Sequence, residues 1–210
     1  MIPKIISLAI GTPKEYNWNH KAKLSGIGKS STKVVELKKL GFVGDDVGNK
    51  QKHGGVDRAV CLYPFEHYSY WEKIFQKKLV LPAFGENITA TGMTEEQVCI
   101  GDIYQIGDAI VQVTQGRVPC DTISKYNEEK KLLKKVVETS LTGYFFRVLE
   151  EGAIKNDSEI NVIDRPPKRI SVAFATNILF HQHQDKESIE KILKVDSLSE
   201  EWRNRYLKFL

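Results

Sequence analysis

The residues with the clearest chemical potential lie in the stretch TQGRVPC, at positions 114–120 of this 210-residue chain. An alternating apolar run at positions 109–113 leads into it and predicts a β-strand. Arg117, Pro119 and Cys120 follow that strand. A nearby guanidinium favours the thiolate form of a cysteine, and a thiolate is both a nucleophile and a soft metal ligand. Because Pro119 ends the strand, we expect Cys120 to face a cavity.

The other two cysteines, Cys61 and Cys99, lie within or beside apolar strand patterns, and we expect both to be buried structural residues. No CxxC pair is present, which argues against a zinc site and against a disulfide framework. A sparse, odd set of cysteines is typical of the reducing cytoplasm, where we expect this protein. The N-terminus does not resemble a signal peptide, and no segment has the length of a membrane span.

A second candidate loop reads KHGGVDRAV, at positions 52–60. Its two adjacent glycines allow backbone N–H groups to form a concave turn that suits an anion. The polar residues beside the glycines could bind a ligand, or they could form an ordinary turn with a surface ion pair, and the pattern alone does not decide. The candidate residues of this loop are His53, Gly54, Gly55, Asp57 and Arg58.

Two weaker motifs add polar groups. The sequence FGEN, positions 84–87, offers Glu86 and Asn87 behind a glycine, which alone indicates a turn but which could also bind a heterocycle. The sequence GIGKSS, positions 26–31, resembles the end of a phosphate-binding P-loop. It lacks the earlier glycine and the following helix, so we reject a P-loop and retain Lys29 as a possible anion contact.

The remaining pattern predicts the elements that must position these loops. Short strands separated by turns are expected at 4–10, 32–46, 58–64, 98–115 and 158–167, and helices at 64–78, 127–140, 141–153, 170–182, 186–195 and 199–210. The segment 17–31 is expected to be a loop. Asn127 is the expected N-cap of its helix, and Ser197 begins a predicted capping box. His181 and His183 do not share a helix face and are expected to be surface or packing residues.

This order of elements favours a mainly β fold, a β-barrel with inserted helices, over a doubly wound parallel sheet. We place a domain boundary at 165–168, which gives a barrel domain at 1–165 and a three-helix domain at 166–210. The net charge of +4 is too small to predict a nucleic-acid partner. The C-terminal helices carry only scattered basic residues, so we expect packing, docking or homodimer formation rather than a DNA-binding helix-turn-helix.

The order and spacing of these motifs resemble the MOSC family, the molybdenum cofactor sulfurase C-terminal domain proteins, over about residues 5–165. The resemblance rests on GDDVGNKQKHGGVDRAVCLYP, FGEN, VCIGDIYQIGDAIVQVTQGRVPC and LTGYFFRVLEEGAIKNDSEINVID. It is strongest for the stand-alone bacterial branch, and the C-terminal tail resembles that branch's three-helix appendage.

This resemblance implies a β-barrel that binds the molybdenum cofactor at one mouth, with Cys120 as the protein thiolate on molybdenum. It also implies reductive detoxification of N-hydroxylated base analogues of the hydroxylaminopurine type. The electron donor implied is a flavoprotein reductase. Pyridoxal phosphate is not expected as a cofactor. His53 is our candidate proton donor, because imidazole titrates near neutrality. The expected cofactor-binding residues are Lys29, Gly54, Gly55, Asp57, Arg58, Glu86, Asn87, Gln115 and Arg117.

Two positions depart from the pattern of this family. Gly116 stands where proline usually precedes the arginine, and Thr122 stands where a lysine often follows the cysteine. The glycine loosens the loop, while Asp121 adds a negative charge next to the thiol that opposes the effect of Arg117.

Two other functions use the same thiol. A cofactor or sulfur carrier would bind molybdopterin, or a persulfide on Cys120, without reductive turnover. A cysteine hydrolase would pair Cys120 with His53, but the sequence shows no third residue to orient that histidine.

Overall fold

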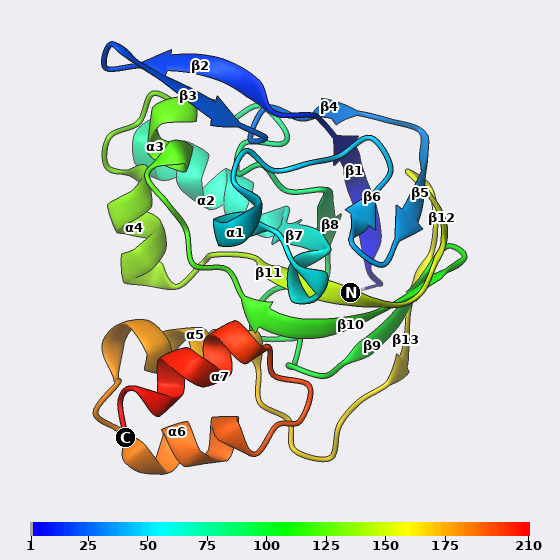
Figure 1. Cartoon of the computed structure of the whole chain (residues 1–210), viewed down its shortest axis with the longest axis vertical. Helices are drawn as coiled ribbons and strands as arrows, with labels where there is room; N and C mark the ends of the chain where they lie inside the picture. Colours follow the sequence, from blue (N-terminus) through cyan, green and yellow to red (C-terminus); the bar gives the residue numbers. More distant parts are fainter. Residues whose placement is uncertain (1) are drawn as a thin grey trace.

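The computed structural model describes residues 2–210, without the side chain of Lys52, and shows a sheet curled into a half-barrel with helices around it (Figure 1). This confirms the predicted mainly β fold with inserted helices and a C-terminal three-helix unit. Among the described residues, no helix is long and apolar enough to cross a membrane.

The large sheet has the strand order β13-β9-β10-β11-β7-β8-β1-β4. Its strands are β1 (Lys4–Ile10), β4 (Ser30–Ser31), β7 (Val60–Pro64), β8 (Ile88–Thr91), β9 (Ile103–Ile106), β10 (Ala109–Gly116), β11 (Tyr144–Glu150) and β13 (Ile160–Asp164). Neighbouring strands are antiparallel, except that β7 and β8 run parallel. The parallel register, which pairs Leu62 with Ile88, brings the start of β7 at Cys61 beside the FGEN turn that precedes β8.

Two smaller sheets border the half-barrel. One has the order β12-β5-β6, from β12 (Gly152–Lys155), β5 (Val34–Lys38) and β6 (Gly41–Phe42). The other is the hairpin of β2 (Lys14–Trp18) and β3 (Lys21–Ser25). The prediction of a loop at 17–31 is therefore wrong over this hairpin. Asn19 and His20 adopt the left-handed conformation that a tight hairpin turn requires.

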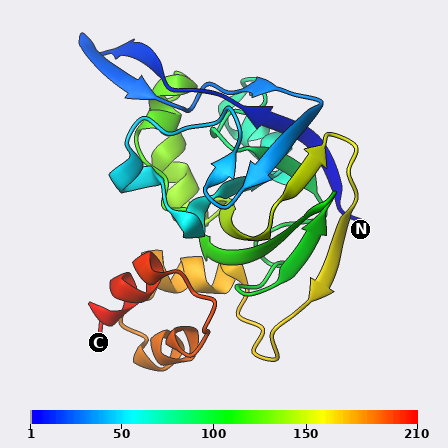
Figure 2. The ribbon, with the colours of Figure 1, turned by 45° about the vertical axis from the view of Figure 1, so that its right-hand side comes forward.

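The helices form two groups, on either side of the open edge of the half-barrel (Figures 1 and 2). They are α1 (Lys50–His53), the short 3-10 helix η1 (Val56–Arg58), α2 (Glu66–Phe75), α3 (Thr122–Tyr126), α4 (Leu132–Thr139), α5 (Val172–His181), α6 (Lys186–Leu193) and α7 (Glu200–Leu207). The helices predicted at 64–78 and in the C-terminal region are confirmed, with ends that differ by a few residues.

The helix predicted at 141–153 is wrong, because these residues form β11 and the start of β12. The decisive pattern has a period of two residues: Tyr144, Phe146 and Val148 are buried, and the residues between them are less so. Aromatic and β-branched residues favour a strand, and Gly143, with φ of 72°, starts it sharply.

Two helix caps also differ from the prediction. Asn127 caps the C-terminal end of α3 and donates from Nδ2 to the carbonyls of Ala83 and Ile123, so it does not begin the next helix. Ser199, and not Ser197, is the N-cap of α7, where its Oγ accepts a hydrogen bond from the backbone N–H of Trp202.

The C-terminal helices share one hydrophobic core with the half-barrel. Trp202 and Tyr206 of α7 are fully buried and belong to the same cluster as Val113 and Phe146 of the sheet. The predicted boundary at 165–168 falls between β13 and α5, but the buried side chains on its two sides are continuous. The three-helix unit is therefore fixed against the end of β10.

The close approach at this junction explains the unusual Gly116. A Cβ atom there would lie 2.4 Å from Thr176 Oγ1 and 2.7 Å from Trp202 Cη2. Within residues 2–210, neither Thr176 Oγ1 nor Trp202 Nε1 has a hydrogen-bond partner, so packing rather than polar contact holds them there. The sequence suggested that Gly116 loosens the loop. In the structure, the missing side chain of Gly116 leaves the space that Thr176 of α5 and Trp202 of α7 occupy.

We predict that Gly116→Ala lowers the free energy of unfolding by about 1–3 kcal/mol, because the added methyl group overpacks the junction. Urea denaturation would measure this loss. The matched control is Thr176→Ala, which removes a buried hydroxyl without a partner and should leave stability nearly unchanged. Equal stability of Gly116→Ala and the wild type would contradict the account.

Candidate functional site

A cavity of about 910 Å³ lies at the open end of the half-barrel. This volume is at the upper end of the range for small-molecule sites, so it suits a large cofactor or a cofactor with a substrate. The lining comes mainly from residues 23–27 and Lys29, from residues 45–51 and 53–55, from Cys61, from the FGEN turn, from Gln115 at the end of β10, from the loop that follows it at 117–120, and from α7.

The end of β10 brings Gln115, Arg117 and Cys120 to this cavity, as the sequence predicted that a strand end would. The backbone N–H of Arg117 donates to the carbonyl of Gly143, which fixes the turn after the strand. Cys120 is partly exposed. Gln115 is only 2% exposed, and its Oε1 has no hydrogen-bond partner among the described residues. A buried, unpaired acceptor in a cavity wall indicates a position for a ligand's N–H group.

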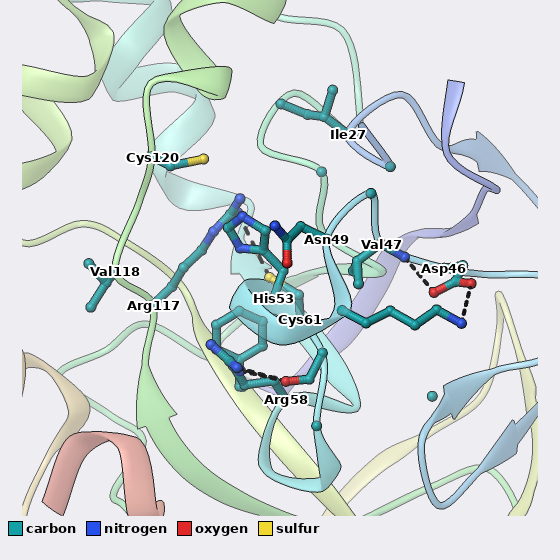
Figure 3. Close-up of a pocket in the computed structure, with 18 of the residues that line it drawn as sticks. Ile27, Asp46, Val47, Asn49, His53, Arg58, Cys61, Arg117, Val118 and Cys120 are labelled. Atoms are coloured by element: carbon teal, nitrogen blue, oxygen red, sulfur yellow. Dashed lines mark hydrogen bonds and ion pairs between the residues drawn. The ribbon is translucent and has the colours of Figure 1, made fainter. Parts of the chain in front are cut away.

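Arg117 contacts the second cavity thiol, Cys61, instead of a carboxylate. Its Nη1 lies 3.8 Å from Cys61 Sγ, as Figure 3 shows between the labelled side chains. Burial raises the pKa of the Cys61 thiol above its ordinary value, and the guanidinium opposes that rise. The prediction that Cys61 is buried is confirmed, but this thiol also forms part of the cavity wall.

The glycine turn forms another part of the cavity lining. His53 ends α1 and points toward Arg117 in Figure 3, and Gly54 and Gly55 also line the cavity. Arg58 donates from Nε and Nη2 to the carbonyl of Gly54, at 3.1 and 2.7 Å, and from Nη1 to Glu201 of α7, at 2.7 Å. Arg58 therefore ties the turn to the three-helix unit.

Asp45 is a buried carboxylate that binds Lys29 and Asn87, two further residues of the cavity lining. It accepts hydrogen bonds from Lys29 Nζ, from Asn87 Nδ2 at 2.9 Å and from the backbone N–H of Gly11 at 2.8 Å. Only 4% of the Lys29 side chain and 12% of the Asp45 side chain are exposed, so this is a buried ion pair. Asn87 also bonds through Oδ1 to the backbone N–H of Cys61.

Two predicted site residues do not line the cavity. Glu86 is fully buried and accepts hydrogen bonds from Tyr68, Thr89 and the backbone of Phe84. Burial raises the pKa of its carboxyl group. Asp57 pairs with Arg147 of β11 and accepts a hydrogen bond from the backbone N–H of Glu200 at the start of α7, at 3.4 Å.

The structure adds site residues that the sequence reasoning missed. These are Asp45, Cys61, Glu201 and the remaining cavity-lining residues of α7, namely Glu200, Asn204 and Arg205. Asp121, expected beside the thiol, pairs with Lys23 and Lys125, which lower the pKa of its carboxyl group. Its charge is thus partly balanced.

Comparison with known proteins shows the family to which this chain belongs. Residues 49–161 match the MOSC domain, and residues 170–205 match the YiiM-like 3-alpha helix domain. The chain belongs to the MOSC domain family. This MOSC protein is 42% identical over 205 residues to YflK of Bacillus subtilis (strain 168), a match that covers 97% of this chain and 93% of YflK.

Two further relatives extend the comparison. YiiM of Escherichia coli (strain K12) is 34% identical over 169 residues, which cover 79% of this chain and 75% of YiiM. A protein of Gibberella moniliformis named "Reductase" is 36% identical over 136 residues, or 63% of this chain, but these residues span only 24% of that protein. The crystal structure of YiiM from Geobacillus stearothermophilus superposes with a TM-score of 0.85 at 32% identity, and the match covers 99% of each chain.

The residues at the cavity of this MOSC protein fit the cofactor that the family name implies. A molybdopterin needs hydrogen-bond acceptors for its ring edges and a cation for its phosphate, and the wall offers Gln115 Oε1 and the guanidinium of Arg117, which has no carboxylate partner among the described residues. Among residues 2–210, no group of three or more His, Cys, Asp or Glu is arranged to hold a metal ion. A pterin-bound metal brings its own sulfur ligands, so a single protein thiolate is sufficient.

We predict that Asp45→Ala lowers the free energy of unfolding by about 3–5 kcal/mol, because it leaves the buried Lys29 ammonium without its counter-charge. Urea denaturation would measure it. The double variant Asp45→Leu with Lys29→Met removes both charges and should be more stable than Asp45→Ala alone. If the double variant is less stable than Asp45→Ala, the unpaired charge of Lys29 is not the cause of the lost stability.

Proposed function

We propose that this MOSC protein is a molybdenum-cofactor-dependent reductase of N-hydroxylated compounds, of the hydroxylaminopurine type. The observation that carries the proposal is the wall that follows β10, where a partly exposed thiol, Cys120, lies in one cavity with the buried, unpaired Gln115 Oε1 and the cation Arg117. Family membership and the relative named "Reductase" support it.

The cofactor-binding roles rest on side chains that line the cavity. Cys120 would bind the metal as a thiolate. Gln115 Oε1 would accept a hydrogen bond from the pterin ring, because it has no partner within the protein. Arg117, which contacts a thiol and no carboxylate, would bind the phosphate. Lys29 is already paired with Asp45 and would contribute less. Gly54 and Gly55 contribute mainly space, since the backbone N–H of Gly54 already donates to the carbonyl of Lys50.

The chemical step removes one oxygen atom. An N-hydroxylated amine takes up two electrons and two protons, the N–O bond breaks, and the products are the amine and water. The cofactor, when bound, supplies the two-electron centre. His53, at the cavity wall beside the glycine turn, would deliver one proton to the departing hydroxyl oxygen.

The electrons must come from a partner, which we propose to be a flavoprotein reductase. This partner is the one that the resemblance to the MOSC family implies. The substrate is a small molecule, and we propose neither a nucleic-acid polymer nor a membrane as a partner.

We predict that Cys120→Ser abolishes reduction of 6-hydroxylaminopurine by the cofactor-loaded protein, because a serine hydroxyl is a poor ligand for a soft metal. Product adenine would be measured by chromatography with a chemical or flavoprotein electron donor. The control is Cys99→Ala, a change at a buried cysteine outside the cavity, which should keep its activity.

Two outcomes would contradict this function. Full activity of Cys120→Ser would show that the reaction does not need the Cys120 thiolate. Cofactor binding by the wild type without any reduction would favour the carrier, and an added sulfur on Cys120 in the mass spectrum would favour its sulfur-transfer form.

A further inference from the structure

One side of the molecule carries an excess of positive charge next to the cavity. The segments 14–23, 72–78 and 121–139 contain 11 lysines and 6 acidic residues, whereas the rest of the chain contains 20 basic and 21 acidic residues. These segments form the hairpin of β2 and β3, the end of α2 with the residues after it, and the helices α3 and α4. They lie together on one side of the half-barrel in Figure 1, and we call them the lysine surface.

The helix α3 connects the parts of the lysine surface. At the start of α3, Lys23 of β3 binds Asp121 Oδ1, at 3.4 Å, and donates to Thr122 Oγ1, at 3.1 Å. At its end, Lys77 donates to the carbonyl of Asn127. The helix α4 follows α3 and packs against it. Lysines from separate parts of the chain therefore surround one short helix.

Many charges of the lysine surface are not balanced within the protein. Asp121 is held between Lys23 and Lys125, so its carboxylate is already engaged. Six lysines of the surface are exposed and have no ion pair among residues 2–210, namely Lys14, Lys21, Lys73, Lys78, Lys130 and Lys131. These ammonium groups are available to the carboxylates of a partner.

Aromatic side chains lie among these lysines. The rings of Tyr16 and Trp18 stack at 4.7 Å, and the ring of Tyr126 of α3 meets that of Tyr16 edge-on, at 6.0 Å. All three side chains are partly exposed. Tyrosine and tryptophan contribute much of the binding energy of protein–protein interfaces, and charged groups form their rim. The lysine surface therefore has the composition of a contact site for another protein.

The lysine surface adjoins the proposed redox centre. Cys120 lies two residues before the start of α3, and Cys120, Thr122 and Lys23 line the same cavity. An electron that enters over α3 therefore has a short path to Cys120. Electron-transfer complexes bury small interfaces and depend on charge attraction for a fast encounter, which an excess of lysine provides.

We propose that the lysine surface is the docking site of the electron donor, and that this donor is a flavoprotein with an acidic face. This inference rests on the proposed function, because it names where the electrons for the same cavity enter. Carboxylates around the exposed flavin edge of the donor would pair with the lysines. A fully reduced flavin supplies the two electrons that cleavage of the N–O bond consumes, and it releases its two protons to the solvent.

Binding of oxidised flavodoxin, a small acidic flavoprotein, tests the docking site without turnover. Lys130→Glu with Lys131→Glu reverses two exposed charges, and acidic residues at the start of α4 suit the helix dipole, so this variant should keep its fold. The matched control is Lys33→Glu with Lys155→Glu, which makes the same change of net charge at β5 and β12, away from α3 (Figure 1).

Isothermal titration calorimetry with the purified full chain measures the affinity. Flavodoxin should bind the wild type about tenfold more weakly when the salt concentration rises from about 20 mM to about 200 mM. At the lower salt concentration, the α4 variant should bind flavodoxin about tenfold more weakly than the wild type, and the control should bind within about twofold of it. Equal weakening in both variants, or no binding of flavodoxin to the wild type, would overturn the docking site. Binding of single-stranded poly(U) in place of flavodoxin would assign the surface to RNA and would also overturn it.

A second measurement separates this inference from the proposed function. It follows the anaerobic oxidation of reduced flavodoxin by the cofactor-loaded protein and 6-hydroxylaminopurine, and the α4 variant should slow this step about tenfold. If a chemical donor supports reduction but both variants accept electrons from flavodoxin as the wild type does, only the docking site fails. If flavodoxin binds as predicted but no donor supports reduction of an N-hydroxylated compound, only the proposed function fails.

Discussion

One buried carboxylate, that of Asp45, links three segments of the chain at the cavity wall. Asp45 accepts hydrogen bonds from the end of β1, from Lys29 and from Asn87, and Asn87 in turn bonds to the backbone of β7 at Cys61. A buried charge without a partner is costly, so each of these segments is constrained by the others. The consequence is functional as well as structural: Lys29 is held at the wall, with its charge balanced, before any ligand binds. The cavity is thus organised by the protein itself.

A second constraint joins the two halves of the chain. The absence of a side chain at Gly116 lets Thr176 and Trp202 approach β10, and this close contact brings α7 to the cavity. The departure from the usual proline before the arginine therefore belongs to the packing of the three-helix unit. Arg58 completes the connection, because it bonds both to the glycine turn and to Glu201. A change in the three-helix unit should consequently affect the glycine turn, although the two are far apart in the sequence.

The sequence predicted the mainly β class, the three C-terminal helices and the convergence of several loops, because period-two alternation and strand-ending prolines are local signals. It did not predict Asp45, whose importance depends on partners 16, 34 and 42 positions away. Glu86 shows the same limit. The neighbouring residues of the FGEN motif do not indicate Tyr68, whose hydroxyl donates a hydrogen bond to one oxygen of the Glu86 carboxylate. The strand β11 was missed because the three-residue apolar run at 144–146 is compatible with either helix or strand, and pairing with β10 and β7 decides between them. The role of α7 in the cavity could not be found without the tertiary packing of Trp202.

The central claim is that Cys120 binds molybdenum within this cavity. The most direct test is the metal content of the protein purified from a host that makes molybdopterin, measured by inductively coupled plasma mass spectrometry. The account predicts close to one molybdenum per chain in the wild type and in Cys99→Ala, and almost none in Cys120→Ala with the fold intact by circular dichroism. Molybdenum retained in full by Cys120→Ala, or absent from the wild type, would contradict it.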